Sequence, residues 1–197
     1  MNEDEIRILV LQRLTHLNPS TQPVANWRTY LLDYEPDPQY PDDKYAWLSC
    51  ALALQGIATS NFGVGALLVD GGRILAQGHN EIFIPRFRSD RHAEMVVMDD
   101  WENSAAALVD GALYTSVEPC PMCVVRLSSS AVRRVLYVAP DLSGGMVRRI
   151  DGLPPFWVQM AECKEFGQAR CSSALIRAAS DIFLLNLDEL TERIKAM

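Results

Sequence analysis

Short apolar runs alternate with segments of helical composition through the middle of the chain, and this alternation constrains the fold more than any other feature. The run Val64–Val69 is apolar and leads into the turn Asp70-Gly71-Gly72, which predicts an antiparallel hairpin. Strands and helices that alternate in this way pack as helices on both faces of one sheet. We therefore predict an α/β fold, a three-layer α/β/α sandwich with a mixed sheet of about five strands. The strands are expected at 62–69, 73–79, 111–117, 132–138 and 165–169.

The two ends of the chain differ from this middle part. Residues 1–41 are predicted to be an N-terminal extension, with a helix near 6–14 and an acidic, proline-rich connector at 35–41. Residues 42–197 are predicted to form one domain. We expect a long amphipathic C-terminal helix in this domain, from about residue 172 to residue 187.

The composition excludes several classes of protein. The chain has 18 Lys and Arg against 25 Asp and Glu, a net charge of −7, which argues against a general polyanion binder. No apolar run approaches the roughly 18–20 residues of a membrane-spanning helix, and the acidic start is unlike a secretory signal. The cysteines, five in number, are too few for a disulfide scaffold. We therefore expect a cytoplasmic protein that contacts no membrane.

One set of residues carries metal chemistry. His92 and Glu94 begin one predicted helix, and Cys120 and Cys123 begin the next. A Cys-x-x-Cys at a helix start can direct both sulfurs at one metal, while the positive helix end stabilises the thiolates. One imidazole and two thiolates suit zinc, and three protein ligands leave the fourth position for water, as in catalytic sites. Zinc lowers the pKa of that water toward about 7, and Glu94 can carry its proton to a leaving amine.

These residues resemble the cytidine deaminase-like superfamily of zinc-dependent deaminases, whose signature is H-x-E followed by P-C-x-x-C. The segments His92-Ala93-Glu94 and Pro119-Cys120-Pro121-Met122-Cys123 both satisfy it. The resemblance covers roughly residues 42–183 and implies the superfamily's fold. It also implies one zinc ion per chain on His92, Cys120 and Cys123, with Glu94 as the proton shuttle. Because this family commonly forms dimers, we further expect a homodimer.

The resemblance also suggests residues that contact the substrate. It implies a hydrogen bond from Asn80 and a backbone N–H from Ala93, although an Asn after a strand also commonly satisfies its own backbone. Phe156 and Trp157 lie where related deaminases close the pocket. They are expected either to form an aromatic lid over the substrate or simply to pack in the core. Asp151 lies where relatives that deaminate guanine use an acidic group to contact the base.

Two other interpretations compete with this one. The cysteine pair could belong to a noncatalytic zinc-stabilised scaffold, with Cys163, Cys171 or His79 as a fourth ligand. The arginines of the loop before the metal motif could grip phosphates or form a solvated surface. They are Arg86, Arg88 and Arg91.

The substrate is the least determined part of the prediction. Residues 118–123 look like those of guanine and other free-base deaminases, residues 60–66 look like those of cytidine deaminases, and the tail resembles the tRNA adenosine and guanine branches. Because the chain is acidic, we prefer a small nucleobase or nucleoside of guanine or cytosine type over a nucleic acid. A tRNA adenosine deaminase is the alternative.

Overall fold

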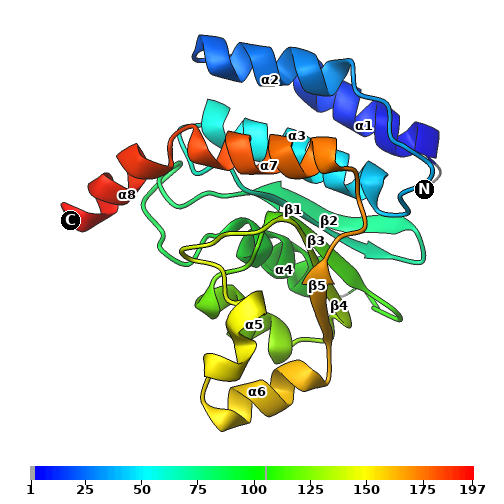
Figure 1. Cartoon of the computed structure of the whole chain (residues 1–197), viewed down its shortest axis with the longest axis vertical. Coiled ribbons are helices and arrows are strands. Elements are labelled where there is room, and N and C mark those ends of the chain that lie inside the picture. The colour runs from blue at the N-terminus through cyan, green and yellow to red at the C-terminus, as the bar shows by residue number, and fades with distance from the viewer. Residues whose placement is uncertain (1–2, 105) are drawn as a thin grey trace.

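A mixed sheet forms the middle layer of the molecule (Figure 1). The computed structural model describes residues 3–104 and 106–197, and within them one five-stranded sheet has the order β2-β1-β3-β4-β5. The strands are β1 (Gly65–Asp70), β2 (Arg73–His79), β3 (Ala112–Val117), β4 (Arg134–Ala139) and β5 (Glu165–Gln168). Strand β1 is antiparallel to β2 and β3, whereas β4 is parallel to β3 and β5.

The burial of the strands follows their positions in the sheet. Every residue of the central strands β1 and β3 is buried, as expected of strands that are covered on both faces. Strand β2 lies at the edge and is mostly half-buried. The turn between β1 and β2 places Gly71 at φ +54° and Gly72 at φ +78°, a backbone region that favours glycine. The predicted hairpin is confirmed.

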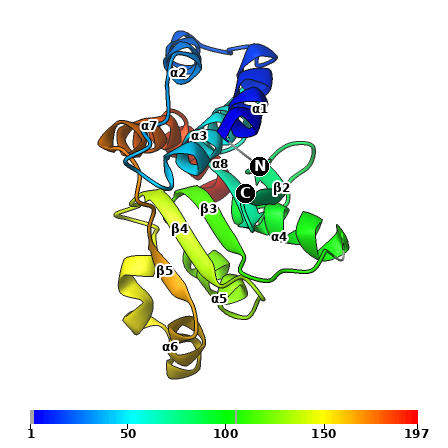
Figure 2. The ribbon, with the colours of Figure 1, turned by 90° about the vertical axis from the view of Figure 1, so that its right-hand side faces the viewer.

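Helices cover both faces of the sheet (Figure 2). On one face α3 (Asp43–Ala58) and α7 (Ser173–Leu184) pack against side chains such as Leu67 and Tyr114. On the other face α4 (Ala93–Ser104) and α5 (Pro121–Ser128) pack against the alternate side chains Leu68 and Leu113. Successive side chains of a strand point to opposite faces of the sheet, so one strand contributes to both apolar clusters. The predicted α/β class and three-layer sandwich are confirmed.

The N-terminal extension contains two helices, α1 (Glu3–Thr15) and α2 (Gln22–Leu32), of which only the first was expected. Helix α2 gives a weak signal because its buried side chains are Val24 and Leu31, too few to mark a helical period. Both helices place apolar residues in the same cluster as α3, and Trp47 of α3 donates a hydrogen bond to the carbonyl of Leu31 at 2.9 Å. The boundary near residue 41 stays a prediction.

The C-terminal segment contains a second helix after the one that was expected. Helix α7 ends at Leu184, and α8 (Leu187–Lys195) then runs outward to the C-terminus (Figure 1). Asn186 has φ −137° and ψ 12°, outside the helical region, and its Nδ2 donates to the carbonyl of Asn61 at 2.8 Å. That contact fixes a new direction for the chain. The helix predicted at 172–187 corresponds to α7, whereas α8 was not predicted.

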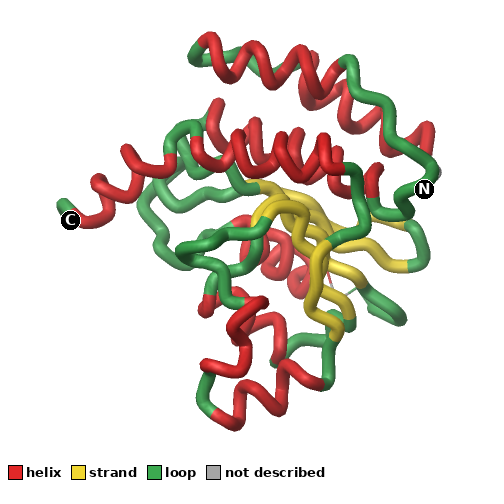
Figure 3. The backbone as a smooth tube through the Cα atoms, viewed as in Figure 1, coloured by secondary structure: helices red, strands yellow, loops and turns green. Residues whose placement is uncertain are grey.

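The remaining elements join the strands on the parallel side of the sheet (Figure 3). The 3₁₀ helix η1 (Val147–Gly152) and helix α6 (Pro155–Glu162) lie between β4 and β5 and were not predicted. Of the helices in the described part of the chain, none is long and apolar enough to cross a membrane.

Candidate metal centre and substrate pocket

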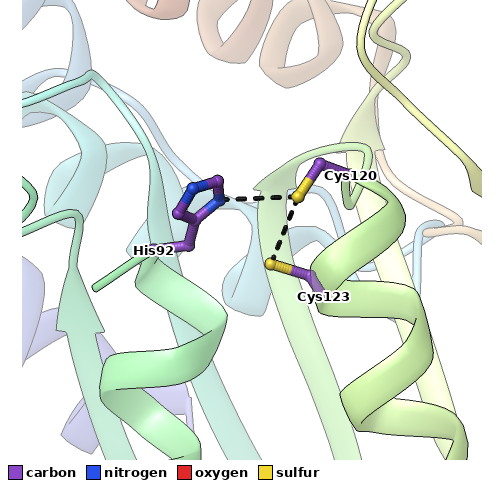
Figure 4. A group of neighbouring side chains, drawn as sticks. All are labelled: His92, Cys120 and Cys123. Carbon is purple, nitrogen blue, oxygen red and sulfur yellow. Dashed lines mark hydrogen bonds between the residues drawn. The ribbon is translucent and has the colours of Figure 1, made fainter. Parts of the chain in front are cut away.

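Two helix N-termini bring the predicted metal ligands together (Figure 4). His92 immediately precedes α4, Cys120 is the N-cap of α5, and Cys123 lies in the first turn of α5. The Nδ1 atom of His92 lies 3.6 Å from Sγ of Cys120, which lies 3.7 Å from Sγ of Cys123. The three ligand atoms all fall within 4.8 Å of one another.

These separations fit a tetrahedral zinc ion. With Zn–S bonds of about 2.3 Å and Zn–N bonds of about 2.0–2.1 Å, a tetrahedron separates two sulfurs by about 3.8 Å and a sulfur from a nitrogen by about 3.6 Å. The donor set of two thiolates and one imidazole is also the kind that zinc prefers. The three side chains are therefore arranged to hold zinc.

The fourth ligands of the scaffold interpretation do not join the group. Among residues 3–104 and 106–197, the metal-ligating group consists of His92, Cys120 and Cys123. Cys163 is exposed at the end of α6, and Cys171 is buried in the cluster on the other face of the sheet. The Nδ1 atom of His79 is hydrogen-bonded to the carbonyl of Asn80 at 2.8 Å. Three protein ligands leave one tetrahedral position free for a further ligand.

The electrostatics of the centre favour a thiolate at Cys120. Its pKa is lowered to about 4, first by the hydrogen bond with Cys123 and also by the hydrogen bond with His92, against the effect of burial. The pKa of Cys123 is raised, by its hydrogen bond with Cys120 and by burial. Burial lowers the pKa of His92, but the hydrogen bond and charge of Cys120 act in the opposite direction, and the net pKa of His92 is raised. Cation binding to both sulfurs therefore releases a proton.

Glu94 lies beside the centre without belonging to the ligand group. It is the second residue of α4 and is buried, and its Oε2 atom lies 3.6 Å from Sγ of Cys123. Burial is the main cause that raises the pKa of its carboxyl group. A carboxyl group held in this way can take and return a proton next to the metal ligands.

A cavity of about 200 Å³ opens onto these residues. It is smaller than the pockets of roughly 300–1,000 Å³ that hold drug-sized ligands, so it suits a compact ring system. Its walls come from the ends of β1, β2 and β3, from the start of α4, from residue 141 and from the C-terminal helices. The lining residues are Phe62, Val64, Asn80, Ile82, His92, Ala93, Glu94, Val117, Glu118, Cys120, Asp141, Phe183, Leu187, Thr191 and Ile194.

Two of the predicted substrate contacts, Asn80 and Ala93, line this cavity. Asn80 Oδ1 accepts a hydrogen bond from the backbone N–H of Ile82 at 3.1 Å, which is the turn role. The described residues offer no acceptor to Asn80 Nδ2 or to the N–H of Ala93 at the start of α4. Both groups can therefore donate to a ligand, and the two roles of Asn80 coexist.

The other three predicted contacts do not line the cavity. Asp151 lies in η1, and Phe156 and Trp157 lie in the first turn of α6, where their rings pack edge to face at 5.0 Å. Phe156 is 61% exposed. The chain between β4 and β5 carries all three along the parallel side of the sheet, so within one chain the structure does not bring them to the metal ligands.

The C-terminal helices supply a wall that the sequence interpretation missed. Phe183 lies in the last turn of α7, while Leu187, Thr191 and Ile194 form one side of α8. The spacing of these α8 residues, four and then three, is helical and was the available signal. The last predicted helix ended at Leu187, and no helix was predicted beyond it.

The arginines near the site are engaged by carboxylates and carbonyls. Arg88 pairs with Asp90, and Arg91 pairs with both Glu81 and Asp99. At the other side of the cavity the guanidinium of Arg148 donates to buried Glu118 at 2.8 Å, and Arg149 donates to backbone carbonyls. Arg88, Arg91, Arg148 and Arg149 are thus bound by groups of the chain itself, whereas Arg86 is exposed.

A family model for the cytidine and deoxycytidylate deaminase zinc-binding region matches residues 40–139, about half of the chain. The chain belongs to this family. The match includes all three metal ligands and Glu94, so the resemblance drawn from the two motifs is confirmed.

Named relatives lie within the same superfamily. A tRNA-specific adenosine deaminase of Bacillus subtilis is 39% identical over 84 residues, which are 42% of this chain and 52% of that protein. A tRNA-specific adenosine deaminase of Haemophilus influenzae is 29% identical over 109 residues, 54% of this chain and 62% of that protein. The chain thus spans about half to three-fifths of these relatives' lengths.

Solved structures share the fold. A guanine deaminase from Nitrosomonas europaea matches with a TM-score of 0.57 at 21% identity, covering 85% of this chain and 94% of that one. A structure of the tRNA:A34 deaminases matches with a TM-score of 0.55 at 24% identity, covering 68% and 94%. At these identities the likeness establishes the family's fold and leaves the substrate open.

Proposed function

We propose that the chain is a hydrolytic deaminase that replaces the exocyclic amine of a nucleobase with a carbonyl group and releases ammonia. One observation carries the proposal: a buried carboxyl group, that of Glu94, lies beside a three-ligand zinc centre in a cavity of ring size. A noncatalytic scaffold needs neither the carboxyl group nor the cavity.

The residues divide the chemistry between them. His92, Cys120 and Cys123 would hold the zinc ion, which would lower the pKa of a bound water molecule toward about 7. Glu94 accepts a proton from that nucleophile and delivers it to the base, so that a C–O bond forms, the C–N bond breaks and ammonia leaves. Because burial raises its pKa, the protonated form that Glu94 passes through is less costly than it is in water.

Two residues of the cavity lining can orient the ring. Asn80 and Ala93 line the cavity and offer the donors Nδ2 and backbone N–H, while much of the remaining lining is apolar. Flat heterocycles carry ring nitrogens or carbonyls that accept such bonds, while apolar side chains such as Phe62, Val64 and Ile82 contact the ring itself. Asp151, Phe156 and Trp157 stay predictions, as does the homodimer.

We infer that adenine in tRNA is the first candidate substrate. The support is the relatives, which at 29–39% identity are tRNA-specific adenosine deaminases. This inference reverses the preference drawn from the net charge of −7. Net charge describes the whole surface, and an acidic protein can still present a local basic patch to phosphates.

A free nucleobase or nucleoside of guanine or cytosine type is the second candidate. It is favoured by α8, which covers the cavity with Leu187, Thr191 and Ile194. It is also favoured by the carboxylates that pair with Arg88 and Arg91 in the loop before His92, because paired arginines are less available to phosphates.

A two-arm assay on the zinc-loaded protein decides between the candidates. One arm measures ammonia release from adenine, guanine, cytosine and their nucleosides, and the other measures inosine formed in total tRNA over a series of salt concentrations. Inosine formation that falls steeply with salt supports the tRNA substrate. Ammonia from a free compound with no inosine supports the second candidate. No product in either arm, with zinc bound, contradicts the deaminase proposal.

A further inference from the structure

One carboxylate links the two segments that carry the metal ligands. Asp99, on α4, lies between two arginines: its Oδ2 is 2.9 Å from Nη1 of Arg91, and its Oδ1 is 2.7 Å from Nη2 of Arg126. Arg91 also binds Glu81 at 2.5 Å, and Arg126 also binds Glu102 at 2.9 Å. We call these five residues the Asp99 bridge.

The arginines of the Asp99 bridge lie next to metal ligands in the chain. Arg91 immediately precedes His92, and its backbone carbonyl accepts a hydrogen bond from the N–H of Glu81 at 2.9 Å. Arg126 lies three residues after Cys123, on α5, and its Nη1 is 3.6 Å from Sδ of Met95 on α4. The Asp99 bridge therefore connects the loop end that carries His92 to the helix that carries the cysteines.

The contacts of the Asp99 bridge are half-buried. The side chains of Arg91, Asp99 and Arg126 are 20%, 30% and 32% exposed. Ion pairs at this depth lose less to water and salt than fully exposed pairs do. Removing the charge of Asp99 would leave Arg91 paired only with Glu81 and Arg126 only with Glu102, so no carboxylate would join the two arginines.

We propose that Asp99 is a positioning residue of the metal centre, holding His92 and the cysteine pair at the separation that zinc requires. Groups that orient metal ligands typically change metal affinity by about 10–100-fold when they are altered. The proposal rests on the zinc assignment within the proposed function and is independent of the substrate. An ion pair that only stabilises the fold would leave the affinity for zinc unchanged.

The test compares Asp99→Asn with Asp110→Asn in the full chain. Asp110 forms a half-exposed pair with Arg134 at 3.3 Å at the far end of the sheet, so it controls for loss of an ion pair as such. Zinc affinity is measured by competition with a chromogenic chelator. We expect Asp99→Asn to weaken zinc binding about tenfold and Asp110→Asn to change it by less than about twofold.

A second readout separates positioning from stability. If Asp99 positions the ligands, Asp99→Asn lowers the thermal midpoint of the zinc-loaded protein more than that of the zinc-stripped protein, because bound zinc contributes less to the folded state. Equal shifts in both forms together with unchanged zinc affinity would overturn the proposal.

Two further variants keep the test decisive if Asp99→Asn does not fold. Asp99→Glu keeps the charge and should recover most of the zinc affinity, while Arg126→Gln removes one arm and should weaken binding. Unchanged affinity in Arg126→Gln would also count against the proposal. These measurements involve no substrate. A result that contradicts the positioning role of Asp99 would therefore not contradict the deaminase proposal, and an absence of turnover would not contradict the positioning role.

Discussion

We expect that helix α8 can detach from the remainder of the domain while the sheet and the other helices stay folded. The substitution Leu190→Ala tests this. Leu190 is 4% exposed and packs against Phe62, Ile82 and Phe83. Other contacts that hold α8 are half-buried Leu187, the hydrogen bond from Asn186 to Asn61, and Arg193, which lies 4.3 Å from the ring centre of Phe83. Leu190 is thus the main apolar anchor of a nine-residue helix.

The magnitude follows from this anchor. Truncating a buried leucine to alanine costs about 2 kcal/mol at the lower end of the observed range, which suits a site at the edge of the fold. A loss of about 2 kcal/mol raises the undocked fraction of α8 about 30-fold, since 1.4 kcal/mol is a factor of ten. The apolar clusters on the two faces of the sheet do not include Leu190, so the midpoint of global unfolding should change little.

Hydrogen exchange of backbone amides is the direct assay. In Leu190→Ala the amides of α8 should exchange about 30-fold faster, while those of β1 and β3 keep their rates. Leu184→Ala is the matched control because Leu184 is 59% exposed at the end of α7. If the exchange of α8 is unchanged while the thermal midpoint drops by several degrees, α8 belongs to the cooperative core and the reasoning is refuted.

Three further predictions concern the metal centre and the fold. Glu94→Gln should keep about one zinc per chain but reduce turnover by roughly 100-fold or more; undiminished ammonia release would remove Glu94 from the mechanism. Cys120→Ser should lose zinc and thermal stability together, because metal binding contributes to folding, and a fully loaded, equally stable variant would contradict the ligand assignment. The pKa of Asp70 is lowered by hydrogen bonds from the backbone N–H groups of Asp110 and Val109. Its stabilising effect is therefore present above the unfolded-state pKa of about 3.9 and is lost as the pH falls through the lower folded-state value. Asp70→Asn should accordingly lower the urea midpoint at pH 7, and its deficit should narrow in acid; a deficit independent of pH would show that the charge is not responsible.

Each half of the metal centre could be predicted from the sequence because its residues lie within one helix start. The two sulfurs lie one helical turn apart on α5, and His92 and Glu94 are separated by one residue at the start of α4. Such spacings need no knowledge of tertiary packing. The hairpin and the strands were equally accessible, since apolar runs bounded by glycines predict strands directly.

The pocket walls could not be predicted in the same way, because they come from contacts distant in the chain. The direction of α8 depends on a hydrogen bond between Asn186 and Asn61, which are 125 residues apart. No periodicity within 172–195 reports such a contact. Phe156 and Trp157 failed to reach the cavity for a related reason: their position relative to the cysteines in the chain says little about where the loop after β4 leads.

The division between local and distant determinants has a consequence for the substrate. The family match ends at residue 139, and the chemistry lies within it, whereas the wall formed by Phe183, Leu187, Thr191 and Ile194 lies beyond it. A residue shapes specificity through what it contacts in the bound ligand, so the wall outside the match bears directly on which base is accepted. Similarity in the zinc motif therefore supports an inference about the reaction more strongly than an inference about the substrate. For that reason the tRNA and free-base arms of the assay must be run on this chain itself.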